Sequence, residues 1–350
     1  MIAPPALQQM VDQDGFAFRM GGEPPESEIA PIRERLPMVS SEEASILGNR
    51  ELFGRLAAAA MLAPMFASCR EWAPDLVLRD PAEYSSAVVA GELAIPTAQV
   101  AISLATVEWG SIDVAAPALE SHRSGLVHEL RSSPYLTTFP GSLDRSRFET
   151  TLRFHAPRPT TWEALPDWWD GSTAPLVYLT MGTVLGYMPI AGGLFRTMLK
   201  AFDGLDVRVL LTVGRHFDQA LLGRVASNVH VEPWVDQHRV LAEADLVVCH
   251  GGSGTVFGTV EEGLPLVVIP SFADQFPNGR LVAEHGLGLS IEAGPVAGSG
   301  RAVLDESESP RIAEAVGRVL GEKRFRERAG EVAAEMAATP TSDEILERFT

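Results

Sequence analysis

The sequence has only two cysteines, Cys69 and Cys249, among 350 residues. Two thiols in apolar or helical surroundings form neither the disulfide framework of a small secreted scaffold nor a cysteine-rich zinc site. No pair of acidic residues has a convincing metal-ligand spacing either. The sequence therefore predicts no bound metal and no resident cofactor.

The chain is also poor in basic charge, with 28 Lys and Arg residues against 46 Asp and Glu residues and a net charge of −18. This balance excludes nucleic acid and anionic membrane surfaces as general partners, so an anionic ligand needs a local site. Long apolar runs are missing too: the run at residues 56–67 is short and contains Pro64, as in a kinked core helix. No charged segment precedes an apolar run near Met1, and we expect a cytoplasmic protein without a transmembrane segment.

Length and composition predict two α/β domains, because 350 residues exceed one ordinary core and 46% of them are hydrophobic. We expect the first domain at residues 1–155, a proline-rich linker at 156–174 and the second domain at 175–350. Six buried runs alternate with helical stretches in the second domain, which predicts a doubly wound parallel sheet. The expected strands are residues 176–181, 207–213, 229–232, 245–249, 265–269 and 287–291.

The most informative stretch follows the fourth of these runs, where residues 246–249 end abruptly in His250-Gly251-Gly252-Ser253-Gly254-Thr255. The glycines allow a sharp turn and a close approach of a ligand to the backbone. A helix that starts here presents unsatisfied N–H groups and a partial positive charge, which together predict an anion site. The alternative is an ordinary strand-to-helix turn without a ligand, since such glycine-rich turns are common in parallel α/β proteins.

Asp274 and Gln275 follow the next buried strand, at the sheet edge where open α/β sheets bind ligands. Their side chains suit hydrogen bonds to hydroxyl groups. The alternative for Asp274 is a cap on the helix expected from Phe276.

These residues resemble the donor-binding signature of family 1 glycosyltransferases, above all the bacterial macrolide and antibiotic glycosyltransferases with the two-domain GT-B fold. The resemblance covers nearly the whole chain and is stronger from Pro166 onward. It is carried by residues 250–255, Gly263-Leu264-Pro265, Pro270, Asp274-Gln275, Asn278, Trp234-Val235-Asp236-Gln237 and residues 176–183.

The resemblance implies that the second domain binds a nucleoside-diphosphate sugar, TDP- or UDP-linked, without a metal. His250 and the amides of Gly252, Ser253, Gly254 and Thr255 would hold the pyrophosphate, with Thr183 facing them. Trp234 would stack on the base, the backbone at Val235 would read the base edge, and Gln237 belongs to the same donor motif. Asp274 and Gln275 would bind sugar hydroxyls. The alternative for Trp234 is a core aromatic at the end of a strand.

The implied activity is transfer of a hexose or deoxyhexose, with inversion at the sugar carbon, to a small apolar natural product such as a macrolide or polyketide. A homodimer is compatible with this expectation. Two residues depart from the family: Asp236 replaces the usual proline, and Gly258 stands where plant members carry a ribose-binding glutamate. We therefore expect no ribose contact at residue 258.

The first domain departs further, because the general-base histidine of the family follows its first strand and no histidine precedes His122 here. Met1-Ile2-Ala3 aligns with the family's second strand, which implies that the first strand, its loop and its helix are lacking. We expect unpaired strand edges and exposed apolar surface near Val77, Leu78 and Val100. Either a longer natural chain supplies the missing segment, which we favour, or the protein is short.

Asp80 is the catalytic candidate, since it ends a strand where the family places the acid that orients the base. The alternative is a helix cap before Pro81. Two other functions stay open. A donor-binding partner without turnover would explain the missing base, and an NAD-dependent oxidoreductase would explain the Gly252-x-Gly254 spacing after a strand.

Overall fold

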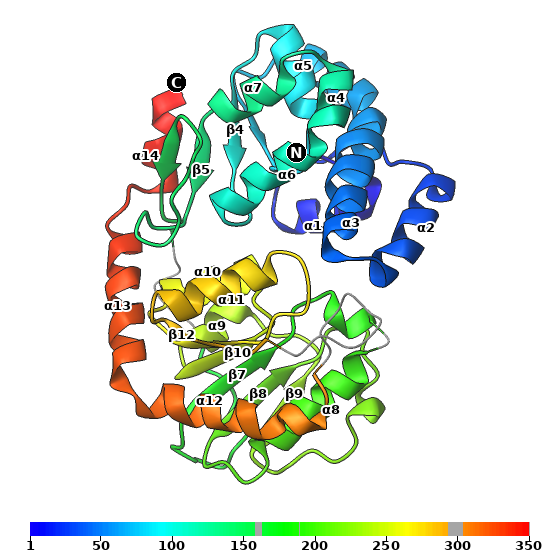
Figure 1. Ribbon diagram of the computed structural model, residues 1–350. Helices are drawn as coiled ribbons and strands as arrows, with labels where there is room; N and C mark the ends of the chain where they lie inside the picture. Colours follow the sequence, from blue (N-terminus) through cyan, green and yellow to red (C-terminus); the bar gives the residue numbers. More distant parts are fainter. Residues whose placement is uncertain (158–162, 189, 293–303, 350) are drawn as a thin grey trace. The chain divides into compact units, whose positions relative to one another are not determined.

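The computed structural model describes residues 1–157, 163–188, 190–292 and 304–349. They form two compact units, each built on parallel strands (Figure 1). Unit 1 consists of Met1–Phe154 and Pro340–Thr350, and unit 2 consists of His155–Thr339.

Unit 2 contains one continuous six-stranded parallel sheet in the order β12-β11-β10-β7-β8-β9. The middle strands are almost wholly buried, as expected of a sheet covered on both faces. Each of the six apolar runs contains one strand, so the predicted doubly wound architecture is confirmed here. The strands are β7 (Leu176–Thr180), β8 (Arg208–Thr212), β9 (Val229–Glu232), β10 (Leu246–Cys249), β11 (Leu266–Val268) and β12 (Gly288–Ser290).

Helices cover both faces of this sheet, with α10 and α11 on one face and α8 and α12 on the other (Figure 1). The main core lies beneath α8 and α12, where Phe195, Phe202 and Ile312 are at most 1% exposed. Because all six strands are parallel, their carboxyl ends lie at one edge of the sheet, which positions the candidate site. The helices are α8 (Ala191–Phe202), α9 (Gln237–Leu241), α10 (Ser253–Glu261), α11 (Gln275–Glu284), α12 (Ser309–Gly321) and α13 (Lys323–Ala337).

Unit 1 has two separate parallel sheets, a pair β1-β2 and a four-stranded sheet in the order β3-β4-β5-β6. In the described residues, β1 pairs only with β2, and β3 pairs only with β4. The strands of this unit therefore fall into two sheets that share no pairing in the described residues. The strands are β1 (Ile2–Ala3), β2 (Arg19–Met20), β3 (Val77–Arg79), β4 (Thr97–Val100), β5 (Tyr135–Thr137) and β6 (Thr151–Arg153).

The longest helix of unit 1 runs over Ser41–Trp72 and comprises α3, a π-helical stretch at Ile46–Ala57, and α4. Its length and composition would suffice to cross a membrane, a test that buried core helices also pass. Met61 and Met65 of α4 are buried together with Val89 of α5, and 39% of the apolar window of the long helix is buried within the structure. The other helical bounds are α1 (Gln8–Gln13), α2 (Glu26–Arg35), α3 (Ser41–Ser45), α4 (Ala58–Trp72), α5 (Ser85–Leu93), α6 (Ala105–His122), α7 (Leu126–Ser132) and α14 (Ser342–Leu346).

The units differ from the expected domain ranges at two places. The last residues pack with unit 1 because Ile345 of α14 is buried against Ala98 and Leu136 of the four-stranded sheet. The segment expected as a linker belongs to unit 2 from residue 155 onward, although residues 158–162 lie outside the described residues. The indole Nε1 of Trp169 donates to the carbonyl of Asn228 at 3.0 Å, which holds part of this segment against unit 2.

Candidate functional site

The loop between β10 and α10 brings the backbone close to its neighbours. Gly251 has a φ of +90°, and a Cβ there would lie 2.7 Å from Cγ1 of Val268 and 3.0 Å from the carbonyl oxygen of Gln275. Gly252 is the N-cap of α10 and supplies no side-chain cap. Its carbonyl accepts the N–H of Thr255 at 3.1 Å, so this amide of the first turn is already occupied. Because no side chain caps α10, the partial positive charge at its N-terminus is not neutralised and can attract an anion.

The imidazole of His250 packs between two glycines. A Cβ on Gly182, whose φ is +71°, would lie 2.7 Å from Nε2 of His250, and a Cβ on Gly252 would collide with the same nitrogen. Any side chain at either position would displace the ring. Gly182 belongs to the loop after β7, so two neighbouring strands of the sheet position this histidine.

Burial lowers the pKa of His250 to about 4, against the opposing influence of the Asp274 carboxylate and the Thr180 carbonyl. The imidazole is therefore neutral near pH 7. It contributes one N–H donor to an anion site instead of a full positive charge. Its Nδ1 is buried without a hydrogen-bond partner among the described residues.

Side-chain hydrogen bonds join the glycine loop to α11. The hydroxyl of Ser253 donates to Oδ2 of Asp274 at 2.6 Å. Nδ2 of Asn278 donates to the carbonyl of Gly251 at 2.8 Å and to Oγ of Ser253 at 3.0 Å. Asp274 is the N-cap residue of α11 but makes no side-chain cap bond, so the capping alternative is wrong.

Gln275 is only 3% exposed and holds the turn that precedes it. Its Oε1 accepts the N–H groups of Ser271 at 2.8 Å and Phe272 at 3.1 Å. The oxygen is thus engaged within the protein, which leaves the amide nitrogen as the other hydrogen-bonding group of this side chain. The sequence predicts that Gln275 binds sugar hydroxyls, but a motif does not reveal that its oxygen is needed by the preceding turn.

The segment after β9 reaches the start of α10 through Gln237. The hydroxyl of Thr255 donates to Oε1 of Gln237 at 3.2 Å. A Cβ on Gly258 would lie 3.0 Å from Nε2 of Gln237, so the glycine leaves room for this amide. Asp236, in place of the family proline, accepts the N–H of His238 at 3.1 Å and caps α9.

Trp234 is 50% exposed, which contradicts the alternative of a core aromatic. Arg215 lies over its ring, with the guanidinium carbon 4.4 Å from the centroid. Val235 is half-buried beside it, and Thr183 is exposed in the loop after β7. All the predicted donor residues therefore lie at the carboxyl edge of the unit 2 sheet or in the loops and helix starts that follow it.

Asp80 lies in unit 1 directly after β3. Its Oδ1 accepts the N–H of Ala82 at 2.7 Å, while α5 begins only at Ser85, so the carboxylate closes a turn and caps no helix. Although the residue is exposed, desolvation of its carboxyl group raises the pKa above the usual range.

The sequence motifs did not predict a row of buried, hydrogen-bonded polar side chains that begins at Arg79, next to Asp80. Arg79 and Gln99 are hydrogen-bonded, and Nε2 of Gln99 donates to Oε2 of Glu108 at 3.0 Å. Burial raises the pKa of Glu108 to about 7. The one available signal was a lone glutamate within the apolar stretch from Ala101 to Trp109.

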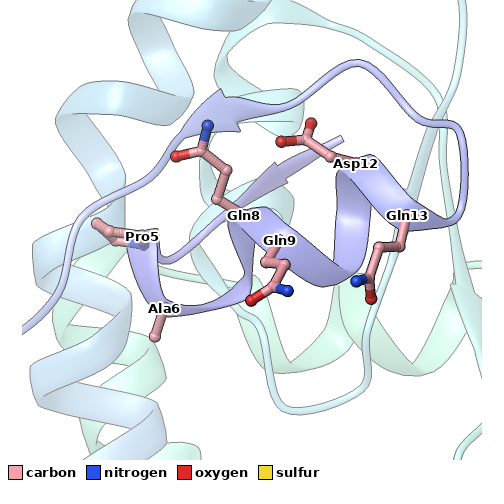
Figure 2. A pocket seen from close by; sticks show the side chains of 6 residues that line it. All are labelled: Pro5, Ala6, Gln8, Gln9, Asp12 and Gln13. Atoms are coloured by element: carbon pink, nitrogen blue, oxygen red, sulfur yellow. The ribbon is translucent and has the colours of Figure 1, made fainter.

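A surface hollow of about 610 Å³ lies along α1 of unit 1 (Figure 2). The side chains of Gln8, Gln9, Asp12 and Gln13 project from this short helix around it, and no predicted site residue is among them. The described residues also contain no cluster of three or more His, Cys, Asp or Glu side chains that could hold a metal. A metal-independent reaction stays a prediction.

Comparisons with known proteins agree on one group. Residues 196–350 match the family model "Erythromycin biosynthesis protein CIII-like, C-terminal domain". Elloramycin glycosyltransferase of Streptomyces olivaceus is 30% identical over 300 residues, which cover 79% of this chain and 71% of that protein.

Solved structures show the same fold. The glycosyltransferase SnogD from Streptomyces nogalater has a TM-score of 0.75 at 24% identity, over 98% of this chain and 89% of that chain. A spinosyn rhamnosyltransferase, SpnG, complexed with thymidine diphosphate, has a TM-score of 0.74 at 22% identity, over 99% and 90% of the two chains.

Proposed function

The chain belongs to the macrolide and antibiotic glycosyltransferases of the GT-B fold and acts on nucleotide sugars, and we propose that its donor is a TDP- or UDP-linked hexose or deoxyhexose. The observation that carries this proposal is the loop between β10 and α10, tied to α11 through Ser253, Asp274 and Asn278. The thymidine diphosphate bound to SpnG, which has the same fold, supports the choice of nucleotide. The oxidoreductase alternative finds no support among the named relatives.

The diphosphate would be held by the start of α10 and by His250. The helix terminus supplies partial positive charge, and the neutral imidazole supplies a single N–H donor. The amides of Gly252, Ser253 and Gly254 complete this group, whereas the Thr255 N–H is already bonded to Gly252. Thr183 would face the phosphates from the loop after β7.

The base and the sugar would lie on opposite sides of the phosphates along the sheet edge. Trp234 would stack on the base, the backbone of Val235 would read the base edge, and Gln237, which accepts the Thr255 hydroxyl, would belong to the same donor site. Asp274 and the amide nitrogen of Gln275 would bind sugar hydroxyls. Because Asp274 also bonds to Ser253, sugar recognition and phosphate recognition share one carboxylate.

We further propose an apolar natural-product acceptor and inversion at the sugar carbon. The acceptor oxygen would bond to C1 as the bond from C1 to the diphosphate breaks, and the acceptor proton would pass to a base. The diphosphate leaves with the negative charge, which the α10 terminus stabilises. Asp80 is the candidate that takes part in proton transfer, by orienting the base.

The alternative of a donor-binding partner without turnover is opposed by the named relatives, which are glycosyltransferases. The first histidine of the chain, His122, has its Nε2 2.8 Å from the carbonyl oxygen of Gly54 in the π-helical stretch and is engaged there. Sugar transfer by the chain, lost in Asp80→Asn, would exclude this function. Donor binding with no transfer to any tested acceptor would support it.

Calorimetry with TDP, UDP and their glucose conjugates tests the donor proposal. His250→Ala should weaken diphosphate binding by about 1.5–3 kcal/mol, the range for a hydrogen bond to a charged group. Asp274→Asn retains an oxygen that can accept from Ser253, so it should weaken the nucleotide sugar more than the bare diphosphate. Unchanged diphosphate affinity in His250→Ala would refute the phosphate role.

A further inference from the structure

The ends of β7, β8 and β9 carry two pairs of ring or planar side chains. Arg215 lies over the ring of Trp234, with its guanidinium carbon 4.4 Å from the ring centroid. Tyr187 and His216 form the second pair, with their ring centroids 5.3 Å apart. Arg215 and His216 are consecutive in sequence, so the two pairs are neighbours on one turn after β8.

Backbone contacts fix the turn that presents Arg215. The N–H of Val213 donates to the carbonyl of Glu232 at 3.1 Å, and the N–H of Gly214 donates to the carbonyl of Pro233 at 3.0 Å. These bonds extend the pairing of β8 and β9 up to the residues that precede Arg215 and Trp234. The register of β8 and β9 therefore brings the Arg215 guanidinium and the Trp234 indole next to each other.

The loop after β7 is held against the same turn. A Cβ on Gly186 would lie 2.6 Å from the carbonyl oxygen of Val213, so only a glycine permits this approach. Tyr187 follows directly and meets His216. Three strand ends thus build one surface from four side chains.

The guanidinium group of Arg215 contacts the Trp234 indole. Arg215 forms no ion pair within the ranges that the structure describes. Asp236, the acid nearest in sequence to Trp234, instead accepts the N–H of His238. Arg215 therefore covers one face of an indole that remains half exposed, and the covered face is closed to any other planar group.

We propose that Arg215 is a positioning residue for the donor base, which holds the Trp234 indole in place so that the base stacks on its opposite face. This inference rests on the proposed function, in which Trp234 stacks on the base. A guanidinium is planar and stacks on an aromatic ring, whereas a lysine ammonium offers a point charge without a plane. Immobilising the indole before binding reduces the ordering that the ligand must cause.

The first measurement uses the free protein. Trp234 is one of six tryptophans, so its acrylamide quenching is obtained as the difference between the wild type and Trp234→Phe. Arg215→Met should increase the quenching of Trp234 because one face of the indole becomes open. Arg224→Met is the matched control, since it removes the same charge from an exposed loop position of unit 2.

The second measurement is a double-mutant cycle for TDP and TMP binding. Arg215→Met should weaken both ligands by about two- to five-fold, the loss expected for an exposed cation–π contact. In a Trp234→Leu background, which has no aromatic ring at this position, the same change should have no further effect, because Arg215 acts through the ring. Arg215→Lys should recover only part of the affinity.

Additive losses in the cycle, or a loss for TDP without one for TMP, would show that Arg215 contacts the phosphates directly and would overturn the inference. An Arg215→Met protein that behaves like Arg224→Met would overturn it as well. If the wild type binds neither TDP nor UDP, the proposed function fails. If TDP binding depends on His250 and Trp234 but not on Arg215, only the inference fails.

Discussion

Unit 1 and unit 2 are both built from parallel strands and covering helices. They differ in the continuity of their sheets and in how many large apolar side chains are exposed. In unit 2 the six strands form one continuous sheet, and the ring of Trp168 stacks on His230 of the edge strand β9 at a centroid distance of 4.2 Å. In unit 1 the strands form two separate sheets, and Leu78 of β3 is 47% exposed. Of the sixteen large exposed hydrophobic side chains in the described residues, eleven belong to unit 1.

The difference indicates where stability and function are concentrated. A parallel sheet is stable when its strands are paired and buried on both faces, and open edges invite association with other strands. Unit 2 meets this requirement and carries all the predicted donor residues. Unit 1 has its core around α6 but leaves the sides of β1 and β3 without partners in the described residues. We therefore expect unit 1 to open first and unit 2 to persist.

The largest effect should come from the core of unit 2. Phe202 of α8 is fully buried, and Phe202→Ala should destabilise unit 2 by about 3–5 kcal/mol because it leaves a cavity. Trp72→Ala, at a position that is 65% exposed in unit 1, should change stability by no more than about 0.5 kcal/mol. Denaturant unfolding followed by hydrogen exchange, resolved by unit, measures both. Equal loss of protection in the two units of Phe202→Ala would mean that they unfold together.

Acidity should act on the units in opposite directions. Burial raises the pKa of Glu108 in unit 1 from 4.5 to about 7, so its contribution to stability is complete below pH 4.5 and is lost as the pH rises through 7. Burial lowers the pKa of His250 in unit 2 from 6.5 to about 4. Its contribution is complete above pH 6.5 and is lost as the pH falls through 4. Each shift corresponds to about 3 kcal/mol.

The measurement is the stability of each unit between pH 4 and 7.5, with exchange rates corrected for their intrinsic pH dependence. Glu108→Gln should flatten the trend in unit 1 only, and His250→Gln should flatten the trend in unit 2 only. Asp80 and Asp144, whose pKa values burial also raises, leave a residual slope of the same sign in unit 1. A wild-type trend that is parallel in both units would contradict this assignment.

The sequence predicted unit 2 well because each strand there is a continuous apolar run between turn residues. The apolar run Leu246–Cys249 predicted the strand, which is confirmed, whereas the anion site at the glycines after it stays a prediction. The bond from Ser253 to Asp274 joins residues 21 positions apart, and no local pattern encodes such a contact. Prediction of exposed apolar surface in unit 1 was right for Leu78, whereas Val77 and Val100 are half-buried. Val100 packs against the cluster of Ala98, Leu136 and Ile345, and Ile345 comes from α14 near the other end of the chain.

A moderate effect is expected from Gly182→Ala. Residues other than glycine lose about 1–2 kcal/mol in the left-handed region, and the new Cβ would also meet the His250 imidazole at 2.7 Å. Gly204→Ala is the matched control, because its φ of +78° is similar and no atom lies within 4 Å of the added Cβ. Both variants should destabilise unit 2, but only Gly182→Ala should lose TDP affinity. Equal affinity in the two variants would show that the ring position does not affect the phosphate site.

The smallest effect on stability, and the most direct test of the two edges, should come from Leu78→Lys. Because Leu78 is already half exposed, the change should alter the stability of unit 1 by about 0.5 kcal/mol or less. A lysine on an open edge opposes pairing with another strand, so hydrophobic-dye fluorescence and self-association should both decrease. Trp168→Ala should do the opposite in unit 2, because it uncovers His230 on β9. If Leu78→Lys leaves dye binding and self-association at the wild-type level while Trp168→Ala raises neither, edge exposure does not distinguish the two units in solution.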